Sequence, residues 1–200
     1  MNTPNKLTVL RMILVPFFVA SLLAGDSLPH HNLIALVIFA AASYTDHLDG
    51  KIARSRNLVT TFGTFMDPLA DKIMVISALV CFVSQGLANV WLVLLIIFRE
   101  FMVTSVRLVA ADTGVVVAAN NWGKAKTVSQ IIAILFVLFF RYLLELVSLG
   151  LLPVFTVFGG EAAFWFALFG NVLLWIATIL AVISGIIYLK QNWEIVAREM

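Results

Sequence analysis

The sequence predicts an all-α, polytopic membrane protein with six transmembrane helices, which form a single domain over residues 1–200. Hydrophobic residues make up 62% of the chain and charged residues 12%, and the mean hydropathy is +1.04. A soluble domain of this size does not bury that much apolar surface. The apolar residues also fall into six long runs, and Lys and Arg gather at alternate connections between the runs. These three observations together predict the fold class.

Each run approaches the roughly 20 residues that an apolar helix needs to cross a bilayer. The first contains Pro16, which a membrane helix tolerates as a kink. The polar stretch 112–126 is typical of a loop that leads into the fifth run. Residues 150–160 are apolar but interrupted by Pro153, which favours an interfacial segment. The predicted spans are residues 8–25, 33 to the segment 46–54, 62–86, 90–111, 127–147 and 163–189.

The distribution of basic residues predicts on which side of the membrane each connection lies. An even number of spans places both termini on one side. The N-terminal segment has Lys6 and Arg11, and the fourth connection has Lys124 and Lys126. The second connection is basic as well, whereas the first, third and fifth have essentially no Lys or Arg. Positively charged connections stay in the cytoplasm, so both termini and the basic connections are expected there.

Four aspartates lie at that cytoplasmic end: Asp46, Asp49, Asp67 and Asp71. On helices, the first two share one stripe and the last two, four residues apart, share a face. A helical hairpin of this kind directs all four carboxylates at one point, where hard cations that prefer oxygen ligands would neutralise them. The neighbouring Arg and Lys residues favour a metal-bridged phosphate site. A divalent-cation transporter is the alternative, although transport sites usually lie nearer the midplane.

Written out, residues 46–71 read D-x2-D-G-x2-A-R-x8-G-x3-D-x3-D. This pattern resembles the signature of the CDP-alcohol phosphotransferase family, and the six-span layout extends the resemblance over nearly the whole chain. Membrane prenyltransferases also have Asp-rich magnesium motifs, but without this glycine–alanine–arginine spacing, so that class ranks lower. The chain matches the family signature at all its fixed positions, which are Asp46, Asp49, Gly50, Ala53, Arg54, Gly63, Asp67 and Asp71.

The resemblance implies an active site that holds two divalent cations, Mg²⁺ or Mn²⁺. Asp46 and Asp67 would bridge the two ions, Asp49 would bind the first ion and Asp71 the second. Asp71 would also be the catalytic base that takes the acceptor proton. The donor implied by the family is CDP-diacylglycerol, and the residues expected to contact its CDP part are Gly50, Arg54 and Thr60, with Thr3, Pro4, Asn5 and Lys6 near the N-terminus.

Basic residues outside the motif indicate the chemistry of the second substrate. Arg99 and Arg107 are eight residues apart, nearly on one face of the fourth predicted span, and Lys124 and Lys126 precede the fifth. Charges at membrane depth are costly and favour a functional role, so these residues favour an anionic acceptor over a neutral one. The alternative is structural: Arg99 pairs with a carboxylate such as Glu100, and the lysines only mark the cytoplasmic side.

The segments FREFMVTSVRL and GKAKT resemble the bacterial branch of the family whose acceptor is sn-glycerol 3-phosphate. The resemblance implies that the C1 hydroxyl of this acceptor attacks the lipid-side phosphorus of CDP-diacylglycerol and releases CMP. It also implies a homodimer in the bacterial cell membrane, with membrane lipid as a partner and no nucleic acid. Phosphatidylglycerol, inositol phosphate and serine are the alternative acceptors within the family.

Overall fold

The computed structural model describes the backbone of residues 3–56, 61–112, 121–193 and 197. Within these ranges it describes every side chain except those of residues 3–4, 26, 47–56, 61–65, 67–68, 71 and 111–112. The described chain is mostly helical, as the sequence predicts. Its helices are α1 (Thr3–Leu23), α2 (His31–Arg56), α3 (Thr61–Ser84), α4 (Val90–Asp112), α5 (Asn121–Ser148) and α6 (Ala162–Gln191). A 3₁₀ turn, η1 (Gly25–Ser27), joins α1 to α2.

Each predicted span lies on one of these helices, but several boundaries differ from the prediction. Helix α1 includes Thr3 and Pro4, before the predicted start of the first span. Pro4 is compatible with a first helical turn, because the N–H groups there have no acceptor within the helix. Helix α5 begins at Asn121, so the prediction of a loop as far as Lys126 was wrong. Residues 150–161 contain an antiparallel hairpin of β1 (Thr156–Val157) and β2 (Gly160–Glu161), in which Thr156 pairs with Glu161.

By length and composition, three helical segments of the described chain are able to cross a membrane, namely Asn5–Leu23, Asn121–Ser148 and Ala162–Gln191. The segment Lys72–Ser84 is apolar but shorter. Large apolar side chains stay exposed on the outer faces of other helices, among them Phe98 and Phe101 of α4. Such exposure is costly in water and normal against lipid tails. The fold is therefore consistent with a helical membrane protein.

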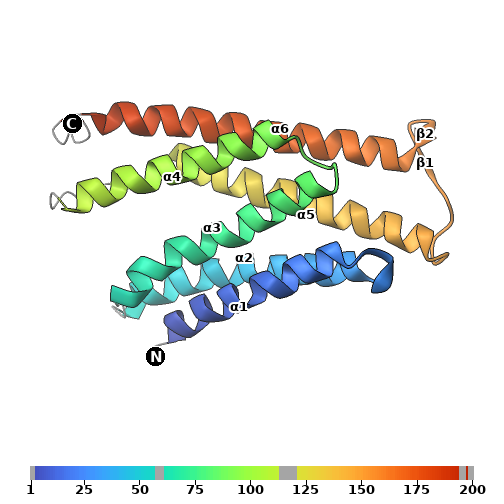
Figure 1. Cartoon of the computed structure of the whole chain (residues 1–200), viewed down its shortest axis with the longest axis horizontal. Coiled ribbons are helices and arrows are strands. Elements are labelled where there is room, and N and C mark those ends of the chain that lie inside the picture. Colours follow the sequence, from blue (N-terminus) through green and yellow to red (C-terminus); the bar gives the residue numbers. More distant parts are fainter. Residues whose placement is uncertain (1–2, 57–60, 113–120, 194–196, 198–200) are drawn as a thin grey trace.

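The helices run along one long axis, and the start of α1 and the end of α6 lie at the same end of the bundle (Figure 1). Helices α1, α2 and α3 pack on one another on one side, and α6 packs against both α4 and α5 on the other. The contact between α2 and α5 joins the two sides. The C-terminal parts of α2 and α4 and the N-terminal parts of α3 and α5 point toward the end that holds the termini (Figure 1). This arrangement gathers the aspartate motif and the basic start of α5 at one end.

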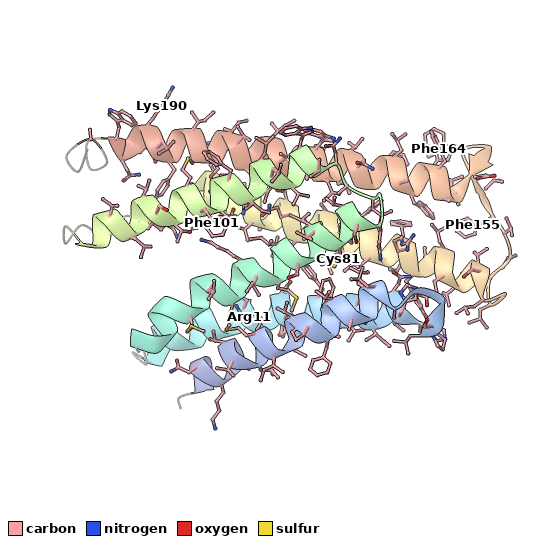
Figure 2. All side chains as sticks on the ribbon, viewed as in Figure 1. Arg11, Cys81, Phe101, Phe155, Phe164 and Lys190 are labelled. Carbon is pink, nitrogen blue, oxygen red and sulfur yellow. The ribbon has the colours of Figure 1, made fainter. Side chains whose placement is uncertain are left out.

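The interior combines large aromatic side chains with small residues that let helix backbones approach closely. Phe18, Phe39 and Phe82 are fully buried, while Ala78 and Ala133 are among the buried small residues. Small residues at helix contacts are typical of packing inside membranes. The single cysteine, Cys81 on α3, is buried in this core as a free thiol (Figure 2). The core thereby holds α2 and α3, the two helices that carry the aspartate motif, against α1 and α5.

Candidate active site

The four predicted metal ligands lie on two consecutive helices that meet at one end of the bundle. Asp46 and Asp49 belong to the C-terminal half of α2, and Asp67 and Asp71 belong to the first turns of α3. Figure 1 shows this end of α2 beside the start of α3. The helical hairpin that the sequence predicts is thus present in the backbone. The four aspartates need to converge for metal binding, and that convergence stays a prediction, because Asp46 is the only one with a described side chain.

Several other predicted site residues also lie outside the part of the chain whose side chains the structure describes. Their roles stay predictions from the motif. These residues are Asp49, Gly50, Arg54, Asp67 and Asp71 of the motif, Thr3 and Pro4 at the N-terminus, and Thr60 between α2 and α3.

Asp46 forms an ion pair with Arg11 of α1, a residue for which the sequence alone assigned no role. Nη1 of Arg11 lies 2.5 Å from Oδ1 of Asp46. The Arg11 side chain is only 2% exposed, whereas that of Asp46 is 41% exposed. Arg11, which Figure 2 labels on α1, therefore joins α1 to α2 and restrains the orientation of Asp46. A charge-assisted hydrogen bond of this kind is stronger than a neutral one.

The chemistry of the predicted donor set fits a hard divalent cation. All four residues supply carboxylate oxygens, which Mg²⁺ and Mn²⁺ prefer. Asp46 keeps its carboxylate accessible while one of its oxygens is held by Arg11. Among the described side chains, no group of three or more His, Cys, Asp or Glu residues is placed to hold a metal ion. That result leaves the motif open, because the side chains of three of its four aspartates are not among those described.

A buried cluster of charges joins α4, α5 and α6 behind the predicted site. Nη1 of Arg99 donates to Oε1 of Glu100 at 3.0 Å, and Nη2 of Arg99 donates to the Ser184 hydroxyl on α6 at 2.7 Å. The ammonium of Lys126 on α5 pairs with the same Glu100 oxygen. All three charged residues are buried. A Cβ at Gly185 would lie 3.0 Å from Cγ of Arg99, so the glycine allows α6 this close approach.

Lys72, the residue after the predicted base Asp71, is attached to the same cluster from α3. Its ammonium donates to the main-chain oxygen of Glu100 at 3.4 Å and also to the hydroxyl of Thr104. The Thr104 hydroxyl in turn donates to the Glu100 main-chain oxygen at 2.7 Å. Lys72 therefore connects the start of α3 to α4, directly beside the position of Asp71.

Arg107 lies two turns after Arg99 on α4 and is exposed. Its Nε donates to the Tyr188 hydroxyl at 3.3 Å, and its guanidinium carbon lies 5.6 Å from the centroid of the Tyr188 ring. Tyr188 is buried and holds Nε of Arg107, while the Arg107 side chain as a whole stays exposed. Lys124, in the first turn of α5, is also exposed. Of the four predicted acceptor residues, Arg107 and Lys124 are thus accessible, and Arg99 and Lys126 are buried in the ion-pair cluster.

Of the N-terminal residues predicted to contact the CDP part of the donor, the structure describes the side chains of Asn5 and Lys6, in the first turns of α1. Asn5 is buried and Lys6 is exposed, at the end of the bundle that also holds the motif. The structural alternative, in which Arg99 pairs with Glu100, is present in the structure. Sequence reasoning did not assign roles to Ser184 or Tyr188. The available signal was a carboxylate beside Arg99 in an apolar helix, since an ionisable residue at that depth needs a partner.

The sequence model of the family described as CDP-alcohol phosphatidyltransferase matches residues 1–183. The chain therefore belongs to the CDP-alcohol phosphotransferase family, which confirms the resemblance based on the motif. Three relatives show members to which it is similar. A protein of Bacillus subtilis named CDP-diacylglycerol–glycerol-3-phosphate 3-phosphatidyltransferase is 43% identical, and the alignment covers 96% of each chain.

A Rickettsia felis protein of the same name is 32% identical, with 94% of each chain covered. A Mycobacterium tuberculosis protein named probable phosphatidylglycerophosphate synthase is 43% identical, with 68% of this chain and 66% of the relative covered. Two of these three alignments extend over nearly the full length of both proteins. The similarity therefore includes α4 and α5, which carry the four predicted acceptor residues, as well as the motif on α2 and α3.

Proposed function

We propose that this protein transfers the phosphatidyl group of CDP-diacylglycerol to sn-glycerol 3-phosphate, giving phosphatidylglycerophosphate and CMP. The observation that carries the proposal is the combination of a complete family signature at residues 46–71 with 43% identity, over 96% of the chain, to a relative named for this reaction. A charged acceptor also agrees with the accessible cations Arg107 and Lys124 at the motif end of the bundle.

Two divalent cations, Mg²⁺ or Mn²⁺, would be held by Asp46, Asp49, Asp67 and Asp71, with Asp46 and Asp67 shared between them. Such ions neutralise charge on the phosphates and polarise the bond to the leaving group. The Arg11 ion pair supports this assignment, because it fixes one oxygen of Asp46 and leaves the carboxylate accessible. Fixing a ligand by a neighbouring hydrogen bond is common around metal sites.

Asp71 is the proposed general base, which takes the proton from the C1 hydroxyl of the acceptor as that oxygen attacks the lipid-side phosphorus. Gly50, Arg54 and Thr60, with Thr3, Pro4, Asn5 and Lys6, are the proposed contacts to the CDP part of the donor. The attachment of Lys72 to Thr104 and Glu100 supports a fixed position for the start of α3. A base is effective only when it is held within hydrogen-bond reach of the proton it removes.

The phosphate of the acceptor is assigned to the basic residues of α4 and α5. Arg107 and Lys124 are proposed as direct contacts, since both are exposed. Arg99 and Lys126 are buried and add positive charge beneath these two contacts, with Glu100 as their shared counter-ion. Arginine suits this role because its planar guanidinium forms paired hydrogen bonds with phosphate oxygens. A neutral acceptor would have no anionic group to pair with these cations.

The enzyme is further proposed to span the bacterial cell membrane six times, with both termini in the cytoplasm, and to act as a homodimer. The six helices and the gathering of both termini at the motif end support this layout. At such a place, a soluble phosphate ester approaches from the cytoplasm while the lipid donor stays in the leaflet.

The test is a CMP-release assay with purified protein, CDP-diacylglycerol, and Mg²⁺ or Mn²⁺. Glycerol 3-phosphate, inositol phosphate, serine and phosphatidylglycerol are supplied separately as acceptors. Glycerol 3-phosphate alone should support rapid turnover. Asp71→Asn should abolish CMP release while donor binding persists, with Lys190→Gln, an exposed change on α6, as the control. Rapid turnover with another acceptor would reassign the substrate. Divalent-ion flux into vesicles without nucleotide chemistry would replace the proposal with a transporter.

A further inference from the structure

The carboxylate of Glu145 on α5 caps the first turn of α2 at the end of the bundle opposite the motif. Its Oε1 accepts a hydrogen bond from the backbone N–H of His31 at 2.9 Å, and its Oε2 accepts one from the backbone N–H of Asn32 at 3.1 Å. The first N–H groups of a helix have no partner within the helix, so a carboxylate there is strongly favoured. Both oxygens of Glu145 are therefore engaged by α2.

Arg141 lies one turn before Glu145 on α5, and this spacing predicts an ion pair between them. The structure differs: Glu145 binds the α2 backbone instead, because two otherwise unpartnered N–H groups outweigh one i,i+4 contact. Nε of Arg141 is buried and has no hydrogen-bond partner within the described part of the chain. An arginine cannot lose its charge in a protein. The half-buried guanidinium of Arg141 is therefore available to an anion from outside this set of residues.

Arg141 and Leu144 lie in the walls of two cavities, one polar and one apolar. The polar cavity has a volume of about 600 Å³ and lies between the turn before α2 and the end of α5. Besides Arg141, its wall includes His31, Asn32, Glu145 and Ser148. The apolar cavity, of about 140 Å³, extends from Arg141 between α5 and α6, where it is lined by side chains such as Val137, Phe140, Phe166 and Ala167.

Two further buried polar atoms in the wall of the polar cavity have no partner among the described residues. They are Nδ1 of His31, whose residue is 7% exposed, and Oδ1 of Asn32, whose residue is 2% exposed. Buried polar atoms are nearly always hydrogen-bonded, and each exception calls for an explanation. A ligand with both hydroxyl groups and phosphate oxygen atoms would satisfy them together with Arg141, because the hydroxyl donates to Oδ1 of Asn32 and the phosphate accepts from the guanidinium.

We propose that this end of the bundle binds one anionic phospholipid of the bilayer, separate from the predicted active site. The phosphate pairs with the Arg141 guanidinium, and the polar headgroup occupies the cavity beside His31 and Asn32. One acyl chain enters the apolar cavity between α5 and α6, which begins at the same Arg141. A free phosphate ester would fill only the polar half, whereas a phospholipid matches a charged cavity joined to an apolar one. Phosphate is also the anion that a bilayer supplies at headgroup depth.

The test is native mass spectrometry of the delipidated full chain in a neutral detergent with EDTA, titrated with dioleoyl-phosphatidylglycerol. Dioleoylglycerol provides the chains without phosphate, and glycerol phosphate provides the headgroup without chains. Arg141→Gln should weaken binding of one phosphatidylglycerol about tenfold or more, the usual size for loss of a hydrogen bond to a charged group. Arg141→Lys keeps the charge and should retain most of the affinity. Lys190→Gln, which removes a cation at the other end, should leave it unchanged.

The apolar cavity is tested by Ala167→Trp, which fills it from an exposed position, against Leu168→Trp on the neighbouring exposed position outside the cavity. The first should displace the lipid and the second should not. Equal binding to wild type and Arg141→Gln would overturn the proposal, as would glycerol phosphate competing as well as the lipid, which would indicate a free-anion site. Should Arg141→Gln fail to fold, the Arg141→Lys and Ala167→Trp results still decide the question.

Discussion

Glu100 is the shared counter-ion of two buried cations, so its neutralisation should destabilise the protein strongly. Glu100→Gln keeps the shape of the side chain and removes its charge. The Glu100, Arg99 and Lys126 side chains are at most 11% exposed, so solvent screens their pairing little. Removing one partner of a buried ion pair costs about 3–5 kcal/mol. Because the amide oxygen still accepts a hydrogen bond and Ser184 still holds Arg99, we expect the lower end, about 3 kcal/mol.

The assay is equilibrium unfolding of the full chain in detergent, with the helical signal followed against denaturant. Glu161→Gln is the matched control, since it makes the same chemical change at an exposed position and should shift stability by less than about 0.5 kcal/mol. The double variant Glu100→Gln with Lys126→Gln should recover part of the loss, because it removes one stranded cation. A Glu100→Gln protein within about 1 kcal/mol of wild type would refute the reasoning.

Three further results are expected. Thr104→Val removes the hydroxyl that holds Lys72, so it should lower kcat severalfold and cost about 1 kcal/mol of stability. Ser105→Ala is the control, and a change in stability without a change in kcat would contradict the prediction. Arg107→Gln should raise the KM for glycerol 3-phosphate about tenfold or more in CMP-release kinetics, and a defect confined to the donor would reassign it. EDTA should abolish CMP release and added Mg²⁺ or Mn²⁺ should restore it, whereas activity that survives chelation would argue against a metal site.

The helices could be predicted from the sequence because apolar runs of this length have few other solutions in lipid. The start of α5 was missed for a tertiary reason. Residues 121–126 look like a loop by composition, yet Lys126 is buried and helical because it reaches Glu100 on α4. Local polarity alone does not reveal a partner that lies 26 residues away.

The aspartate motif was recognisable because its spacing is set by helix geometry within two short segments. The residues that hold the motif in place could not be recognised from the sequence, since their contacts depend on packing between helices distant in sequence. Arg11 pairs with Asp46 across 35 residues, and no local pattern indicates that contact. Arg141 and Glu145 show the opposite case: the spacing indicated a pair, and the start of α2 took the carboxylate instead.

The cap that Glu145 forms on α2 also restricts piston-like motion of that helix. Asp46 follows His31 by 15 residues, which is roughly 22 Å along the axis at about 1.5 Å per residue. The first turn of α2 is secured to α5, and Asp46, in the C-terminal half of the helix, is held by Arg11. The position of Asp46 along the axis of the bundle therefore depends partly on the contact between Glu145 and the first turn of α2. A change in packing at that contact would shift α2 along its axis and move Asp46 with it.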